Sequence, residues 1–497
     1  MTDLTSRSER ADLAALARQA MLQRGLDPDF PAAAIEQAER LSGPARDSAL
    51  ADQTNLLWCS IDNEDSRDLD QLTVCEGLSG GSVRIHVAVA DVDALIAKGT
   101  PVDEHARRNT TSVYTPARIF PMLLERLSTG LTSLNPQEDR LAIVISYLVG
   151  ADGAVSEGEV KRALVRNRAK LDYNSVGAWL EGAAIPPAIT ETPGLADQIR
   201  TQYEAAQRLK LRRHEEGALD LEAIEPRATV VNGRVVDLRR ETKNAARSLI
   251  EDFMIAANGV TARYLESKGL PSVRRIVRSP ARWDRLQVLA EELGDSLPSA
   301  PDPKALADFL ARRRQADPLR FPDLSLAVVK LLGRGEYVLT RSHEEEAGHF
   351  GLAVRDYVHS TAPNRRFPDL ITHRLLKAGM SGSPPAYSGE ELEELALRCT
   401  KQEDAADKVE RQMRKSASAL LLSSRIGQSF EAIVTGAAAK GTWVRIFAPP
   451  AEGRLIRGAK GLDVGDRLQV RLARTDVEQG FIDFERDSSA GKRQNLS

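Results

Sequence analysis

The pattern of apolar and polar positions divides the chain into regions of different character. Between residues 51 and 425, apolar runs of strand length, such as residues 83–90 and 141–149, alternate with segments whose apolar residues recur at helical spacing, such as residues 245–265. From residue 430 to 484 the pattern changes to short β-type runs separated by glycine. About five such runs predict a small closed barrel of the OB type. The sequence therefore predicts an α+β fold with a C-terminal barrel.

The N-terminal region is predicted to be helical. Two short helices are expected on either side of a break at residues 25–31, which is rich in glycine and proline. Such a pair forms either a helix-turn-helix or a cap packed on the next domain, and the sequence leaves both interpretations open. The predicted domains are a helical domain at residues 1–50, a large mixed α/β domain at 51–425, the barrel at 426–487 and a disordered polar tail at 488–497.

One acidic stretch stands out within the mixed domain. Residues 56–59 and 72–74 are apolar and predict two strands, and the loop between them carries five acids. These are Asp62, Glu64, Asp65, Asp68 and Asp70. Carboxylates this close repel one another unless a cation lies among them, and hard oxygen ligands suit magnesium. Many acidic loops are solvated surface turns, so the loop alone does not decide between the two interpretations.

Composition narrows the class of protein without identifying it. The 497 residues are 42% hydrophobic and 28% charged, with a formal net charge of −3, so a nucleic-acid-binding surface would have to be a local patch. The three cysteines form no CxxC pair, which argues against a thiolate zinc site and fits a reducing compartment. The sequence contains no secretion-signal pattern and no membrane-spanning apolar run, so we expect a cytoplasmic protein without a membrane partner.

Four passages occur in a fixed order along the chain. They are residues 60–71 around the acidic loop, residues 254–258 on a predicted helix, residues 349–352 followed by the loop 361–367, and residues 369–376. Together they resemble the ribonuclease II / ribonuclease R family of exoribonucleases, over roughly residues 52–425 with an OB-type RNA-binding barrel after them. The resemblance implies that the mixed domain is catalytic. His349 and His373, which lie in these passages, are expected to pack in the core and not to bind a metal.

The resemblance also implies a set of site residues. Magnesium, or alternatively manganese, would be held by Asp62, Asp68, Asp70 and Gln71, where Gln71 occupies a position that is aspartate in the family. Asp70 and Arg365 would be catalytic, with Arg365 beside the scissile phosphate. RNA would be contacted by Tyr114, Tyr173, Arg365, Arg366 and Glu410. The loop before the arginines also departs from the family pattern, because Asn364 follows Pro363 where the family has isoleucine.

The implied function is processive, sequence-independent hydrolysis of single-stranded RNA from its 3′ end, releasing nucleoside 5′-monophosphates by two-metal-ion catalysis. The first 50 residues do not resemble the family's cold-shock barrels, so a more open channel that admits duplex RNA with a 3′ overhang is expected. Basic stretches at residues 161–170 and 274–285 are either phosphate contacts or solvated helix faces. The protein is expected to be a monomer.

Two other functions remain open from the sequence. An RNA-binding protein with weakened catalysis would keep the fold and lose chemistry at Gln71. A DNA-binding regulator would use the N-terminal helix pair. The barrel fits the exoribonuclease and the RNA-binding protein, whereas only the helix pair fits the regulator.

Overall fold

The apolar run at residues 83–90 forms β4 (Val83–Ala90), an inner strand of a seven-stranded mixed sheet. The computed structural model describes residues 12–222, 226–231, 234–240, 243–318, 320–341, 348–438, 440–462 and 464–487. The sheet order is β1-β8-β7-β4-β3-β2-β9. The other strands are β1 (Ala51–Asp52), β2 (Cys59–Asp62), β3 (Gln71–Gly77), β7 (Asp139–Val149), β8 (Val155–Arg166) and β9 (Ala169–Asp172). Neighbouring strands are antiparallel, except that β1 runs parallel to β8 and β2 runs parallel to β9.

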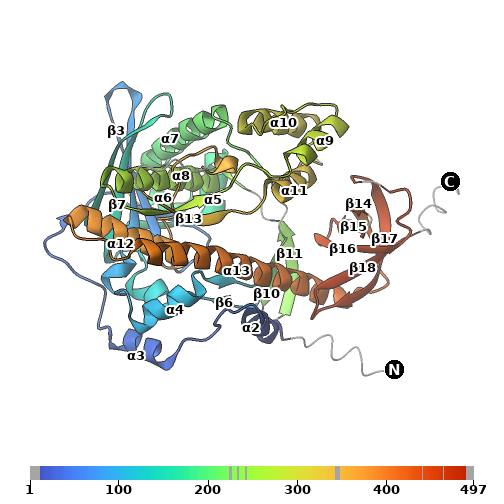
Figure 1. The fold of residues 1–497 in the computed structure, drawn as a ribbon, viewed down its shortest axis with the longest axis horizontal. Coiled ribbons are helices and arrows are strands. Elements are labelled where there is room, and N and C mark those ends of the chain that lie inside the picture. The colour runs from blue at the N-terminus through green and yellow to red at the C-terminus, as the bar shows by residue number, and fades with distance from the viewer. Residues whose placement is uncertain are drawn as a thin grey trace.

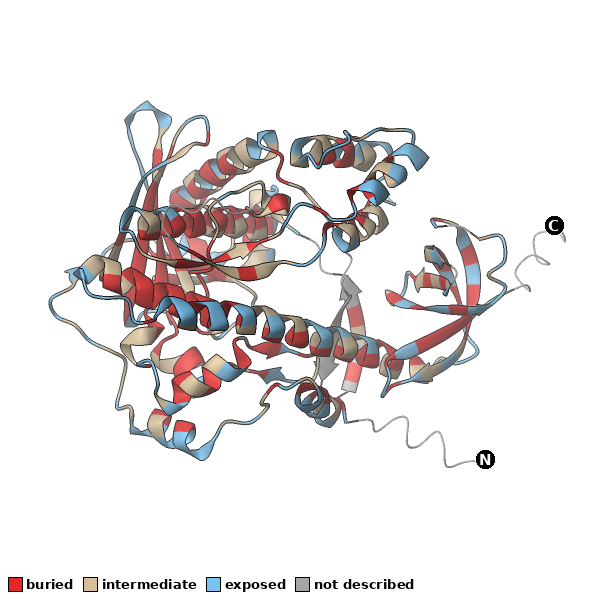
Figure 2. Ribbon diagram, viewed as in Figure 1, coloured by how far each residue is buried: buried red, intermediate tan, exposed pale blue. Residues whose placement is uncertain are grey.

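The inner strands are apolar on both faces because both faces of the sheet are covered (Figure 2). Two long helices, α7 (Leu195–Glu215) and α8 (Ala245–Ser267), pack against the sheet. The hydroxyl of Tyr147 on β7 donates a hydrogen bond to the carbonyl of Phe253 on α8 at 3.1 Å. This bond and the apolar packing around it fix α8 in the core beside the acidic loop.

Two local predictions were wrong in detail. The strand before the acidic loop begins at Cys59 and not at Leu56, because the Trp58 indole N–H donates to the carbonyl of Gln53 and holds the preceding residues in a turn. Of the two interpretations of the basic stretch 161–170, the helix face is wrong, because the stretch lies on β8, on β9 and in the short connection between them. Their cations are engaged within the protein: Arg162 pairs with an aspartate of the core, and Arg166 pairs with Asp139 on β7.

The polypeptide returns to the acidic loop through its second half. The loop 360–366 leads into α12 (Phe367–Ser381), most of whose residues are buried. The 35-residue helix α13 (Gly389–Ser423) then crosses the molecule toward the C-terminal barrel (Figure 1). The remaining helices of this body are α4 (Pro101–Asn109), α5 (Tyr173–Leu180) and α6 (Pro187–Thr190).

The C-terminal strands close into a five-stranded barrel in the order β14-β15-β16-β18-β17. They are β14 (Ser429–Ala438), β15 (Gly441–Ile446), β16 (Ala451–Arg457), β17 (Arg467–Asp476) and β18 (Phe481–Arg486). Buried and exposed residues alternate along β16 and β17, as expected where one face of each strand lines a closed core. The predicted α+β class with a C-terminal barrel is confirmed. The predicted disordered tail, 488–497, lies outside the described residues.

Three helices form a satellite with its own apolar core, built around Phe309 and Phe321. They are α9 (Trp283–Glu292), α10 (Pro303–Ala316) and α11 (Phe321–Leu332), between β12 (Ser272–Ile276) and β13 (Glu336–Thr340), which pair with each other. Arg445 of the barrel and Asp323 of α11 form a two-bond ion pair at 2.8 and 3.1 Å.

Two further two-stranded sheets lie outside these units. They are formed by β5 (Val113–Tyr114) with β6 (Ile119–Phe120), and by β10 (Pro226–Val231) with β11 (Arg234–Arg240).

The two N-terminal helices pack against different parts of the body. Helix α2 (Leu13–Gln23) lies on α13, and α3 (Ala32–Arg40) lies on α4. Their buried residues belong to two separate apolar clusters. This arrangement is that of a packing cap. In the part of the chain described here, no helix combines the length and the apolar character needed to cross a lipid bilayer.

Candidate active site

The acidic loop connects β2 to β3 and carries three of the predicted aspartates. Asp62 is the last residue of β2, and its Oδ1 accepts hydrogen bonds from the Asn63 backbone N–H at 2.7 Å and the Ser66 hydroxyl at 2.9 Å. Asp68 is half-buried, and Asp70 is only 2% exposed directly before β3. The sheet therefore positions the ends of the loop, and the turn at Asn63–Ser66 shapes its middle.

The carboxylates of this loop influence one another's ionisation. Burial raises the pKa of Asp70 to about 7, an effect that Arg365 opposes and Asp68 reinforces. Burial likewise raises the pKa of Asp68, with Asp62 adding to the increase. Such shifts are those of acids that lie close together away from bulk water. A cation placed among them would favour their charged forms.

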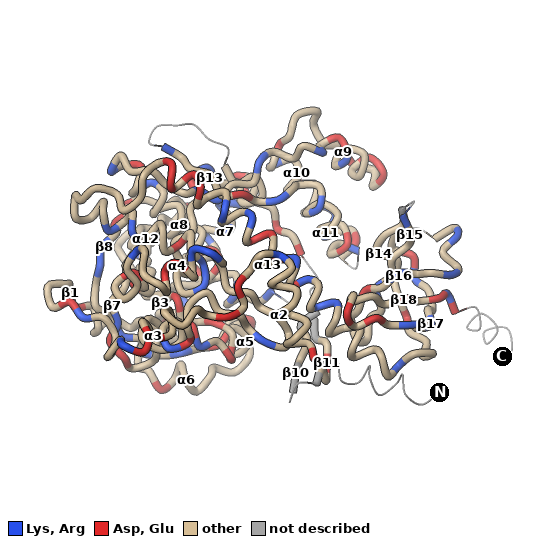
Figure 3. Tube along the Cα trace, turned by 60° about the horizontal axis from the view of Figure 1, so that its bottom comes forward, with Lys and Arg blue, Asp and Glu red and all other residues tan. Residues whose placement is uncertain are grey.

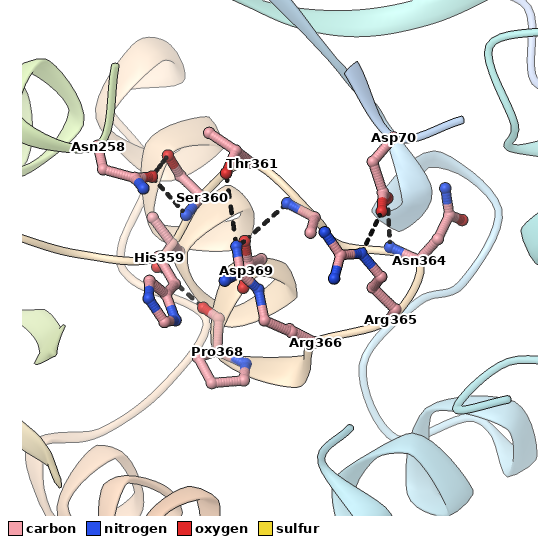
Figure 4. Close-up of polar contacts among 12 residues, drawn as sticks. Asp70, Asn258, His359, Ser360, Thr361, Asn364, Arg365, Arg366, Pro368 and Asp369 are labelled. Atoms are coloured by element: carbon pink, nitrogen blue, oxygen red, sulfur yellow. Dashed lines mark hydrogen bonds and ion pairs between the residues drawn. The ribbon is translucent and has the colours of Figure 1, made fainter. Parts of the chain in front are cut away.

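The loop after residue 360 meets the acidic loop directly. The backbone N–H of Asn364 donates to Asp70 Oδ1 at 3.0 Å, and Arg365 Nε donates to Asp70 Oδ2 at 3.2 Å (Figure 4). Asn364 is 1% exposed, and its side-chain oxygen accepts a hydrogen bond from the Thr132 hydroxyl at 2.5 Å. The departure from the family pattern at position 364 therefore lies in a buried, hydrogen-bonded residue.

Two further buried side chains hold the same loop from its other side (Figure 4). The side-chain oxygen of Asn258 on α8 accepts from the backbone N–H and the hydroxyl of Ser360, at 3.0 and 2.8 Å. Asp369 Oδ1 on α12 accepts from the Ala362 N–H and from Arg366 Nη2, both at 2.8 Å. Sequence reasoning gave no role to Asn258 or Asp369, although both lie in the passages that carry the resemblance.

The predicted aromatic and acidic RNA contacts lie on three separate elements. Tyr114 on β5 is 37% exposed, and its hydroxyl donates to Asp68 Oδ2 at 3.4 Å. Glu410 on α13 accepts the backbone N–H of Tyr114 at 2.8 Å, which links α13 to β5. Tyr173 begins α5 and lies 4.7 Å from the Arg247 guanidinium, in a cation–π arrangement. Arg247 also donates to the side-chain oxygen of Asn63 in the acidic loop at 2.9 Å, so both tyrosine rings lie near that loop.

A cavity of about 350 Å³ adjoins these residues on the side of α8. The predicted residues that line it are Gln71, Tyr173 and Arg365. The other lining residues are Lys243, Arg247, Ile250, Glu251, Met254 and Thr361. Arg366, by contrast, turns toward Asp369 and Thr361 (Figure 4). The structure thus separates the two predicted arginines, with Arg365 at the cavity and Arg366 bound to α12.

The donor chemistry of the loop suits magnesium, because aspartate oxygens are hard ligands. Both oxygens of Asp70, however, already accept hydrogen bonds from the 360–366 loop. Within the described ranges, no three histidine, cysteine, aspartate or glutamate side chains gather closely enough to form a metal site. The residues therefore fit a metal by their chemistry and charge, while Asp70 is held by protein donors.

Elsewhere in the described residues, basic and acidic residues are mixed along the chain (Figure 3). Figure 3 shows lysine and arginine interspersed with aspartate and glutamate along the trace. In the basic stretch 274–285, Arg274 pairs with Asp356 at 2.9 Å and Arg275 with Glu403 at 2.7 Å. These two arginines thus serve internal ion pairs. His349 and His373 bind backbone atoms: His349 Nδ1 accepts from Leu352 N–H, and His373 Nε2 lies 2.7 Å from the Ser360 carbonyl oxygen.

Several known proteins are similar to this chain in sequence and in fold. The chain is 30% identical over 508 aligned positions to ribonuclease R of Escherichia coli (strain K12), covering 94% of this chain and 61% of that protein. It thus spans about three fifths of the length of the curated relatives it matches. Two solved structures of Mycoplasma genitalium RNase R share its fold with TM-scores of 0.85 at 22% identity. Both cover 96% of this chain; the complex with ribose-methylated single-stranded RNA is itself 78% covered, and the complex with double-stranded RNA 83%.

Two family descriptions match most of the chain. The RNB domain matches residues 51–382, and the RNase II-type exonuclease C-terminal S1 domain matches residues 428–487. The first match covers the sheet, the acidic loop and the 360–366 loop, and the second covers the barrel. The chain therefore belongs to the ribonuclease II / ribonuclease R (RNB) family.

Proposed function

We propose that this protein is an exoribonuclease that hydrolyses RNA from the 3′ end and releases nucleoside 5′-monophosphates. The observation that carries the proposal is the contact between Asp70 of the acidic loop and Arg365 of the 360–366 loop, beside a cavity of about 350 Å³. This contact joins an acidic cluster to a fixed guanidinium, and both are useful for attack on a phosphodiester. Family membership supports the same activity.

Each group has a distinct task in this proposal. Arg365 would donate hydrogen bonds to the non-bridging oxygens of the scissile phosphate, where negative charge develops. Asp62, Asp68 and Asp70 would hold magnesium, with Gln71 offering a neutral amide oxygen. The bound ions would supply an activated water and charge neutralisation. Tyr114 and Tyr173 would stack on bases without regard to sequence, which suits processive degradation.

Single-stranded RNA is the substrate we propose, together with duplex RNA that carries a 3′ overhang. The fold match to RNase R in complex with double-stranded RNA supports the second substrate. The barrel, matched as an S1 domain, would bind the incoming strand. We further propose that the protein acts as a cytoplasmic monomer.

A direct test uses RNA labelled at its 5′ end and incubated with magnesium. The proposal predicts a ladder that shortens from the 3′ end and mononucleotides with a 5′-phosphate, and both should disappear on addition of EDTA. Asp70→Asn should abolish cleavage and still shift RNA in a gel. Products longer than mononucleotides from internal cuts would reject the exonuclease mechanism.

Gln71 favours a second candidate, an RNA-binding protein with weakened catalysis. The amide removes one negative charge from the predicted metal ligands, and fewer charged ligands bind a cation less tightly. The same RNA would then shift in the gel and stay intact. Gln71→Asp should in that case create cleavage that the natural protein lacks.

A further inference from the structure

The charged side chains that line the cavity beside the acidic loop are mainly cationic, whereas the loop itself is negatively charged. One wall is formed by Gln71, Tyr173, Thr361 and Arg365. The other wall is one face of α8, because Arg247, Ile250, Glu251 and Met254 recur at helical spacing, and Lys243 lies just before the helix. The cavity therefore joins the proposed catalytic centre directly, through Gln71 and Arg365.

The charges on its walls are mostly positive. Three lining residues are cationic (Lys243, Arg247 and Arg365) and only Glu251 is acidic. Lys243 pairs with Glu251, and both side chains remain more than 40% exposed, so this pair is open to exchange its partner. Arg247 donates to the side-chain oxygen of Asn63 at 2.9 Å, which holds its guanidinium at the cavity wall.

Gln71 supplies the remaining feature. It follows Asp70 directly and lines the cavity, which Asp70 does not. An amide at this position donates N–H groups and carries no charge, whereas a carboxylate would repel an anion. The negative charge of the acidic loop thus ends at Asp70, and Gln71, the next residue, offers hydrogen-bond donors to the cavity.

We propose that this cavity receives a phosphate monoester on the 3′ oxygen of the terminal nucleotide, so that RNA ending in a 3′-phosphate is a preferred ligand. The inference rests on the proposed function, since it requires that an RNA 3′ end enters here. Tyr173 would stack on the terminal base while Gln71, Lys243 and Arg247 contact the added phosphate. A volume of about 350 Å³ lies within the range of about 300–1,000 Å³ that holds small ligands.

The experiment compares two oligonucleotides of the same sequence, one with a 3′-hydroxyl and one with a 3′-phosphate. Binding is followed by fluorescence polarisation of a 5′ label in EDTA, where hydrolysis makes no contribution. We expect the 3′-phosphate to lower Kd by about tenfold, since hydrogen bonds to charged groups contribute about that much. Equal or weaker binding of the 3′-phosphate RNA would overturn the proposal.

Three variants test which residues recognise the phosphate. Lys243→Gln and Arg247→Gln should each reduce the preference, and Gln71→Glu, which is isosteric but charged, should reverse it. Lys304→Gln is the matched control, because Lys304 is an exposed, ion-paired lysine on the satellite helix α10. A preference that survives all three cavity variants would place the phosphate elsewhere. Thermal unfolding of each variant verifies that it is folded.

Mononucleotide competitors separate two sources of the same phosphate chemistry. Adenosine 3′,5′-bisphosphate should displace the labelled RNA better than adenosine 5′-monophosphate. If the 5′-monophosphate competes equally well, the cavity binds the released nucleotide and the proposal is wrong. This binding assay remains interpretable if the magnesium ladder is absent, so failure of the exonuclease function and failure of the 3′-phosphate site give different results.

Discussion

Arg365 Nε lies 3.2 Å from Asp70 Oδ2, although the two residues are 295 positions apart in the sequence. Asp70 is 2% exposed, whereas the Arg365 side chain is 42% exposed. The arginine thus has one edge fixed by a buried carboxylate and another edge open to the cavity. A guanidinium held in this way loses little freedom when it binds a phosphate, which is the arrangement that preorganised catalysis requires.

Replacing Arg365 should therefore impair catalysis more than RNA binding. We expect Arg365→Ala to lower the single-turnover rate by about 10²–10³-fold, the usual loss for one preorganised donor. Arg365→Lys keeps the charge without the planar donor geometry and should recover only part of the rate. The rate is measured on labelled single-stranded RNA, and the affinity by gel shift in EDTA.

Arg40→Ala is the control for this comparison, since Arg40 is an exposed arginine paired with Glu36 on α3. Its rate should equal that of the natural protein. If Arg365→Ala instead cleaves at the normal rate, Arg365 has no part in stabilising the transition state.

Asp369 should act through the loop that it holds. Its carboxylate is fully buried and binds both the Ala362 N–H and Arg366. Asp369→Ala removes a buried acceptor from the Ala362 N–H and from the Arg366 guanidinium, whose side chain is 23% exposed, so we expect a loss of about 1–3 kcal/mol in the free energy of unfolding. Asp369→Asn keeps an acceptor and should lose less. Urea denaturation measures both.

The same Asp369→Asn protein distinguishes positioning from general damage. At a temperature where it is folded, its rate should fall while its affinity for RNA stays constant, because Arg365 is misplaced but the aromatic contacts remain. Asp356→Asn, which removes the partner of Arg274 in a less buried ion pair, should leave the rate unchanged. A fall in affinity equal to the fall in rate would contradict the positioning role.

The elements that were predictable from the sequence are those whose pattern is local. In α8 and α13, apolar residues at helical spacing reveal a helix face within a few turns. In the barrel strands, alternating apolar and polar residues reveal a strand face within a few residues. Sheet order was not predictable in this way, because β1 joins β8 and β2 joins β9 across more than a hundred residues. Helices α9–α11 pack mainly on one another, and their weaker patterns gave no single prediction.

The site shows the same division. Asp62, Asp68 and Asp70 follow one another closely in the sequence, so their proximity was expected. The placement of Arg365 in the same site came only from the family resemblance, since no periodicity links positions so far apart, and its contact with Asp70 was not predicted. Arg247 was missed, although it lies four residues before Glu251 and therefore on the same face of α8. Arg366 adjoins Arg365 in sequence, but the turn into α12 directs it to Asp369.

Tyr114 offers a test that separates its ring from its hydroxyl. The ring is 37% exposed beside the acidic loop, and the hydroxyl bonds to Asp68. Tyr114→Ala should weaken single-stranded RNA binding by about 1–3 kcal/mol, or roughly five- to 150-fold in Kd, for every base sequence. Tyr114→Phe keeps the ring and should bind normally. Polarisation titrations with poly(A) and poly(U) would reveal any sequence dependence, and equal weakening by both variants would exclude stacking.

His349 predicts how stability depends on pH. Burial lowers its pKa from an ordinary 6.5 to about 4, with Arg275 adding to the decrease, and its Nδ1 accepts the Leu352 N–H. Between these two pH values the unfolded chain binds a proton that the folded protein excludes, so this histidine stabilises the fold above pH 6.5. That contribution declines as the pH falls toward 4 and is then constant.

His349→Asn removes the titration but retains an acceptor for the Leu352 N–H. The difference in unfolding free energy between the natural protein and this variant, measured by urea denaturation at several pH values, cancels the other titrating groups. We expect the natural protein to lose stability relative to the variant as the pH is lowered from 6.5 to 4, with no relative change above pH 7. A difference independent of pH would mean that His349 binds its proton equally well in the folded and unfolded states. In that case the hydrogen bond from the Leu352 N–H would not be what keeps the folded ring neutral.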